Sequence, residues 1–128
     1  SNWNTGNVTT FVGMFSGCKS LNILNVSNFN TEKATNLSEM FYNCQKISEL
    51  DVSHFNTSNV SAMNHMFSGC YEVEVLNVSN FNTSKVKYMQ LMFTNCKKVT
   101  NYRLFNQKKI TKKKNREACK GLLLKLKQ

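Results

Sequence analysis

A 26-residue repeat constrains the fold of this chain more than any other feature of its sequence. The same residue types recur in steps of 26 as Met14-Phe15, Met40-Phe41, Met66-Phe67 and Met92-Phe93, and as Cys18, Cys44, Cys70 and Cys96. So many positions in phase indicate stacked units, each of which buries its apolar side against its neighbours. We therefore expect a shared core that includes Leu50, Phe55, Met66, Phe67, Leu76 and Phe81.

The apolar spacing within one unit predicts two elements. Apolar residues at steps of 3, 3, 1 and 3 occupy Val60, Met63, Met66, Phe67 and Cys70, which favours one face of a short helix. Thr57 and Ser58 precede this run as candidate N-caps. The alternation of Leu76 and Val78 is typical of a short strand with one buried face. One parallel strand and one helix per unit predict an α/β right-handed solenoid.

The repeat also predicts the organisation of the chain. Residues 1–104 form tandem repeats: a partial first unit, then units 24–49, 50–75 and 76–101. In residues 105–128, Cys119 follows Cys96 by 23 positions, and lysines replace the apolar core. This segment is either a degenerate capping unit or a disordered basic tail.

Charge is concentrated at one end of the sequence. Residues 1–104 carry 8 Lys/Arg and 6 Asp/Glu, a net charge of +2, whereas residues 105–128 carry 9 Lys/Arg and one acid, a net charge of +8. The total of +10 is therefore no argument that the repeats themselves bind nucleic acid. The basic segment can bind an anionic polymer through Lys108, Lys109, Lys112, Lys113, Lys114 and Arg116. The alternative is a solvated end without a partner.

The sequence from Leu50 to Cys70 resembles a known repeat. Its period and its Phe-Asn-Thr, Met-Phe and Gly-Cys elements are similar to the 26-residue repeat of BspA-like leucine-rich-repeat surface proteins of bacteria. The resemblance covers residues 1–104. It implies a leucine-rich-repeat-like solenoid in a surface protein or lipoprotein, located at the cell surface or secreted, that binds host or cell-surface proteins and has no catalytic activity. No signal peptide is visible within this chain.

The outward-facing positions of the predicted strands are candidates for partner binding. Residues that alternate with the buried Leu and Val change character from unit to unit, as a specific binding face requires. The candidates are Asn25, Glu49, Asp51, Val75, Asn77 and Arg103. The alternative function is that of an intracellular repeat protein whose basic C-terminal segment binds nucleic acid or another polyanion.

The cysteines of the repeats are predicted to have structural roles. Cysteines carried on helices of neighbouring units would lie roughly 8–10 Å apart, too far for disulfides. We therefore expect Cys18, Cys44, Cys70 and Cys96 to be small core residues, while Cys119 lies outside the regular column. We identify no catalytic constellation, no metal site, no cofactor site and no apolar run of the roughly 18 residues that a membrane span needs.

Overall fold

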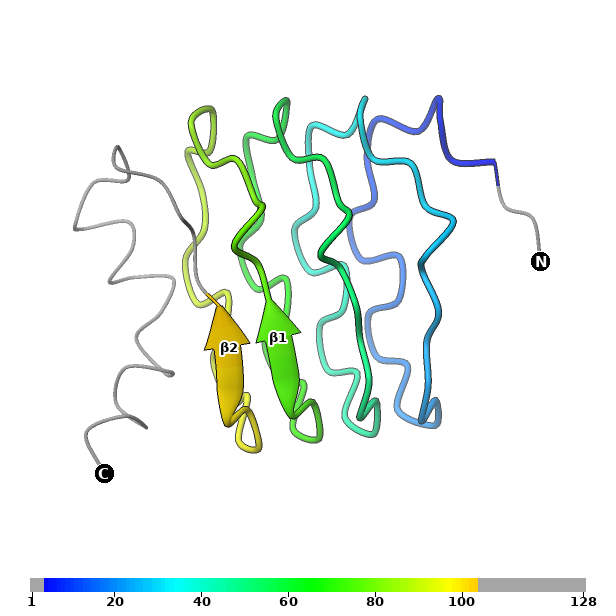
Figure 1. Ribbon diagram of the computed structural model, residues 1–128, viewed down its shortest axis with the longest axis vertical. Helices are drawn as coiled ribbons and strands as arrows, with labels where there is room; N and C mark the ends of the chain where they lie inside the picture. The colour runs from blue at the N-terminus through cyan, green and yellow to red at the C-terminus, as the bar shows by residue number, and fades with distance from the viewer. Residues whose placement is uncertain (1–3, 104–128) are drawn as a thin grey trace.

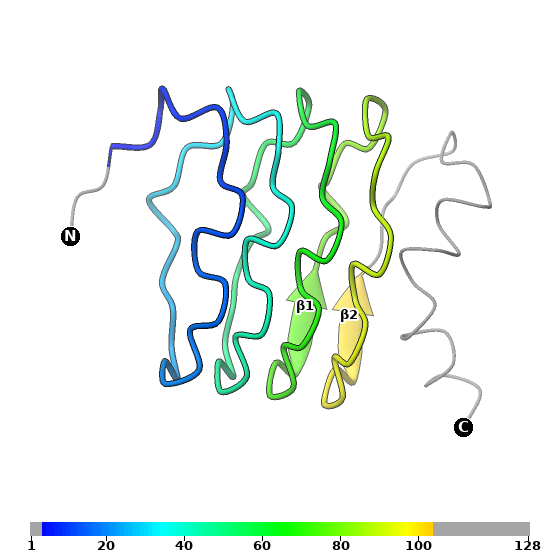
Figure 2. The same cartoon turned by 180° about the vertical axis from the view of Figure 1, so that it is seen from behind.

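Successive 26-residue segments lie side by side in a computed structural model of the chain, which describes residues 4–103. Figure 1 shows these segments as similar loops of backbone that follow one another from blue to yellow, and Figure 2 shows them from behind. Two short strands, β1 (Val75–Asn77) and β2 (Asn101–Arg103), form a parallel sheet in which Leu76 is in register with Tyr102. An isolated parallel bridge joins Ile23 to Glu49 in the earlier segments at the equivalent positions.

The predicted α/β leucine-rich-repeat-like solenoid, with one helix and one strand per unit, is wrong. Between residues 4 and 103 the structure contains no helix, and β1 and β2 are its named strands. The stretch from Val60 to Cys70, predicted to be helical, consists mainly of consecutive turns. Thr57 is correspondingly no helix cap, and its carbonyl accepts the amide of Val60 in a turn.

Backbone torsion angles explain why these turns cannot become a helix. His65 and Gly69 have positive φ angles of 57° and 80°, and Glu39 and Asn43 of the preceding repeat both have φ of 57°. A right-handed helix needs negative φ at every residue. Each positive φ lies at the third residue of a four-residue turn, such as Phe67 to Cys70, in which the Cys70 amide donates to the Phe67 carbonyl.

The amides between these turn donors bond to the next repeat. The amides of His65, Phe67 and Gly69 donate to the carbonyls of Gln90, Met92 and Thr94 at 3.0, 2.9 and 2.8 Å. In an α-helix the same amides would bond to carbonyls four residues earlier. The amides therefore alternate between hydrogen bonds within a turn and hydrogen bonds to the next repeat. Backbone hydrogen bonds thus join neighbouring repeats.

The core lies between the two sides of each loop and is continuous across the repeats. Phe41 stacks on Phe67 with ring centroids 5.6 Å apart, and Phe67 stacks on Phe93 at 5.8 Å. The predicted core residues are confirmed as buried: Leu50, Phe55, Met66, Phe67, Leu76 and Phe81. Burial is therefore the same as a helix would have produced, although the backbone differs.

Buried threonines tie the repeats together at one corner. The Thr57 hydroxyl donates to the Asn82 carbonyl at 3.0 Å and accepts the Asn82 amide at 2.7 Å. Thr31 bonds to Asn56 in the same way. The Asn82 side chain accepts the amide of Ser84 within its own turn. These paired bonds explain why the Phe-Asn-Thr element recurs.

Replacing Gly69 by alanine should lower the free energy of unfolding by about 2–3 kcal/mol, because a methyl group there meets both a positive φ and a close neighbour. A Cβ at Gly69 would clash with the side chain of Asn43 in the preceding repeat. Gly17→Ala is the matched control, because Gly17 has a φ of 75° and a methyl group added there would meet nothing within 4 Å. Urea unfolding of both variants should show the larger loss for Gly69→Ala. Equal losses would contradict the close packing of Gly69 on Asn43.

Candidate partner-binding groove

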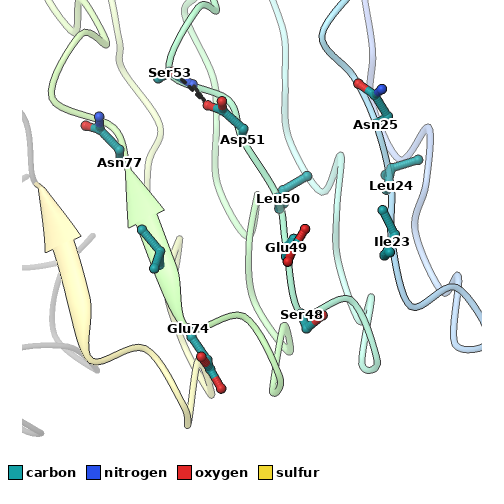
Figure 3. A pocket seen from close by; sticks show the side chains of 11 residues that line it. Ile23, Leu24, Asn25, Ser48, Glu49, Leu50, Asp51, Ser53, Glu74 and Asn77 are labelled. Carbon is teal, nitrogen blue, oxygen red and sulfur yellow. Dashed lines mark hydrogen bonds between the residues drawn. The ribbon is translucent and has the colours of Figure 1, made fainter.

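A groove of about 670 Å³ crosses three neighbouring repeats on the side of the molecule that carries β1. Figure 3 shows that its lining comes from three backbone segments that run alongside one another. The lining residues are Ile23, Leu24, Asn25, Ser48, Glu49, Leu50, Asp51, Ser53, Glu74, Val75 and Asn77. Its base is well fixed, because Leu50 and Leu76 beside it are buried in the core.

One row of the groove places a carboxylate between two aliphatic side chains. Glu49 lies in the middle repeat and is joined to Ile23 by a parallel bridge. Val75 occupies the equivalent position of the following repeat. Ile23 is 66% exposed and Val75 54% exposed, whereas the core aliphatic residues are buried. This row therefore offers apolar surface next to a negative charge.

A second row consists of Asn25, Asp51 and Asn77, and each of these residues closes a local turn. Their Oδ1 atoms accept the amides of the serines two positions later at 2.9, 2.9 and 3.0 Å. The Ser53 hydroxyl also donates to Asp51 at 2.6 Å. The bond from this hydroxyl, followed by that from the Ser53 amide, lowers the pKa of the Asp51 carboxyl. Asp51 therefore both closes a turn through its hydrogen bonds with Ser53 and places a negative charge in the groove.

A comparison with known protein families identifies the family to which the chain belongs. The family of Mycoplasma proteins of unknown function, DUF285, matches residues 1–50 and residues 25–119. The chain belongs to the DUF285 family. Its two matched ranges overlap, as expected when one family pattern fits successive repeats. No curated protein and no solved structure matches this DUF285 chain.

The structure brings most of the predicted partner-binding residues of the DUF285 chain into this groove. Asn25, Glu49, Asp51, Val75 and Asn77 all line it. Arg103 lies in β2, in register with Asn77, and its side chain is outside the described part of the chain. The predicted polyanion-binding residues, Lys108 to Arg116, also lie outside the described residues, as does Cys119.

Sequence reasoning missed two properties of the groove. Glu74 lines it but was not among the candidates. The turn-closing bonds of Asn25, Asp51 and Asn77 were also missed, although an Asn or Asp followed two positions later by Ser is a turn signature that could have indicated them. The variation in residue type between repeats identified the exposed positions, but it did not reveal the hydrogen bonds with which these residues close turns.

Three of the four cysteines in the repeat column lie in the core, as expected. Cys44, Cys70 and Cys96 are buried, Cys18 is half-buried, and all four are free thiols. The helix spacing used to exclude disulfides does not apply, because the described residues contain no helix. Instead the thiols of Cys44, Cys70 and Cys96 donate to the carbonyls of Phe15, Phe41 and Phe67 in the preceding repeat at 3.1–3.2 Å.

Native Cys44 and Cys70 should react with a bulky maleimide far more slowly than they do in the unfolded chain. Burial raises the pKa of the Cys44 thiol to about 12 and also raises that of Cys70, so the reactive thiolate is scarce at neutral pH. Mass spectrometry of labelled peptides measures each cysteine separately, and half-buried Cys18 serves as the internal comparison. Labelling of native Cys70 at the rate found in denaturant would contradict its place in the core.

The described residues offer neither a metal centre nor a membrane-spanning helix. Within residues 4–103 of the DUF285 chain, no group of three His, Cys, Asp or Glu residues could hold a metal ion. No helix in this range is long and apolar enough to cross a membrane. A smaller hollow of about 440 Å³ is lined in part by Tyr71, Glu72, Lys97 and Lys98. There Lys98 pairs with Glu72 at 2.6 Å, and the Lys97 ammonium lies 5.4 Å from the centre of the Tyr71 ring.

Proposed function

We propose that this DUF285 chain is a non-catalytic binding module of a BspA-like bacterial surface protein, located at the cell surface or secreted. In this proposal the groove over residues 23–77 holds a host or cell-surface protein and contributes to adhesion. One observation carries the proposal: exposed Ile23 and Val75 lie in the same groove as the carboxylates of Glu49 and Asp51.

Exposed aliphatic side chains next to charge are typical of a surface that binds another protein. Ile23 and Val75 are among the most exposed large apolar residues in the described part of the chain. Apolar surface beside polar groups favours association, since covering it removes water from the aliphatic groups while the charges select the partner. Small-molecule sites, by contrast, enclose most of the ligand, whereas this groove lies open across three repeats.

The groove is also well ordered before any partner arrives. Its middle segment is held by the turn at Asp51 and by the buried side chain of Leu50. The Ser48 amide bonds to the Asn22 carbonyl of the preceding repeat at 3.0 Å. A preorganised surface loses little conformational entropy on binding, which supports a recognition role.

Binding to intact cells tests this proposal. Fluorescently labelled protein of residues 1–128 should bind host cells in a saturable manner, and protease treatment of the cell surface should remove the binding. Val75→Arg should abolish most of it, because a long charged side chain would fill the groove. Val12→Arg is the matched control: Val12 is 50% exposed and lies outside the lining. Both changes are at exposed positions and should alter stability by no more than about 0.5 kcal/mol.

The result that would contradict the proposal also identifies the alternative. Cell binding that is unchanged in Val75→Arg but lost when Lys112, Lys113 and Lys114 are replaced by glutamine would assign the function to the basic C-terminal segment. Binding that survives removal of cell-surface proteins would exclude a protein partner.

A further inference from the structure

We propose that the partner presents an extended peptide segment whose lysine or arginine residues occupy alternate positions. Two such side chains would pair with Glu49 and Asp51 in the groove. This inference rests on the binding role proposed above and specifies the chemistry of the partner.

The distribution of charge supports a cationic partner. Residues 1–104 contain 6 Asp/Glu and 8 Lys/Arg. Three of the acids, Glu49, Asp51 and Glu74, line the groove, and no Lys/Arg residue whose side chain the structure describes does. A chain with a net charge of +10 thus places half of the acids of its repeats on one surface. A groove lined by one sign of charge attracts the opposite sign.

No salt bridge to Glu49 or Asp51 is found within the described residues, and the charge interaction with His54 is the smallest of the effects that act on the pKa of Asp51. The ion pair found there joins Lys98 to Glu72, outside the groove. Asp51 accepts bonds from the neutral amide and hydroxyl of Ser53, which leave its charge in place. The same bonds lower its pKa, so Asp51 remains ionised in mildly acidic solution.

The aliphatic flanks fit the stems of lysine or arginine. Glu49 lies between exposed Ile23 and Val75, in a row across the three repeats. Lysine and arginine pack their methylene groups on apolar surface while the charged end reaches a polar partner. An acidic head between two aliphatic side chains therefore matches both parts of one basic side chain.

The spacing of the two carboxylates fits an extended peptide. Glu49 and Asp51 are two positions apart, and Glu49 takes part in a parallel bridge, so the backbone there is locally extended. Extended backbone advances about 3.3 Å per residue, which separates alternate residues by roughly 6.6 Å. A peptide lying along this segment has the same separation between side chains on one face. Basic residues at alternate positions would therefore reach both carboxylates together.

Synthetic peptides test this inference on the protein of residues 1–128. One peptide repeats Lys-Thr-Lys-Thr, and the other repeats Lys-Lys-Thr-Thr, which has the same composition but no lysines two positions apart. Fluorescence anisotropy at low salt should show tighter binding of the alternating peptide. Glu49→Gln should weaken its binding about threefold, as expected for a partly exposed ion pair, and the double variant with Asp51→Asn about tenfold.

Matched variants separate groove binding from general attraction. Asp51→Asn retains the turn, because Asn25 and Asn77 make the same bond to their serines. Glu32→Gln removes an exposed acid outside the lining and should leave binding unchanged. Equal affinity for the two peptides, or an equal loss in Glu32→Gln, would overturn the inference.

The two proposals can fail separately. Groove-dependent binding to cells without preference for the alternating peptide would leave the binding role standing and reject its cationic partner. Selective peptide binding without groove-dependent binding to cells would support the peptide chemistry and reject the adhesion role.

Discussion

Replacing Phe67 by alanine should lower the free energy of unfolding by about 3–5 kcal/mol, the usual cost of removing a buried phenylalanine ring. Phe67 is fully buried and stacks on Phe41 and on Phe93 in the two flanking repeats. Its loss would leave a cavity in the middle of the aromatic column and remove both stacking contacts.

Urea unfolding followed by circular dichroism measures this effect. Tyr88→Ala is a suitable comparison, because Tyr88 is also aromatic but is 54% exposed, and its loss should cost no more than about 0.5 kcal/mol. A cost below about 1 kcal/mol for Phe67→Ala would show that the aromatic column does not hold the repeats together.

Replacing Leu76 by alanine should cost about 2–5 kcal/mol, the range for truncating a buried leucine. Leu76 is the central residue of β1, is 2% exposed and is in register with Tyr102 of β2. Its side chain lies in the core, and its neighbours Val75 and Asn77 line the groove. The lost contacts would therefore weaken the platform that supports the exposed residues on either side.

Val75→Ala provides the control on the same strand. Val75 is adjacent to Leu76 but 54% exposed, so its truncation should change the unfolding free energy by no more than about 0.5 kcal/mol. Equal effects of the two substitutions would mean that the assignment of inward and outward faces of β1 is wrong.

The sequence predicted burial well because the same side-chain types recur at each core position. Phe41, Phe67 and Phe93 are 26 positions apart, and each is buried. Any backbone that stacks equal segments must place these rings against one another. The period and the identity of the buried residues were therefore enough to predict the core.

The sequence did not predict the backbone, because two backbones bury the same residues. Val60, Met63, Met66, Phe67 and Cys70 are all buried, as they would be on one face of a helix. The choice depends on where the amides bond, which apolar spacing does not report. A usable signal was present in the column Gly17, Asn43, Gly69 and Asn95, because glycine and asparagine are the residues that most readily adopt positive φ.

The groove could be predicted only in part. Outward-facing positions such as Glu49 and Val75 followed from their alternation with buried Leu50 and Leu76. Glu74 precedes this alternation and was missed for that reason. The double role of Asp51 also could not be read from variation between repeats, because Asn and Asp close the same turn equally well.

The hydrogen-bond partner of the Phe41 amide tests the stacking of the repeats most directly. NMR scalar couplings across hydrogen bonds identify the acceptor carbonyl of each donor. The structure predicts a coupling from the Phe41 amide to the Met66 carbonyl of the next repeat, across a bond of 2.9 Å. A coupling from the Phe41 amide to the carbonyl of Leu37, four residues earlier, would instead show a helix and contradict this account.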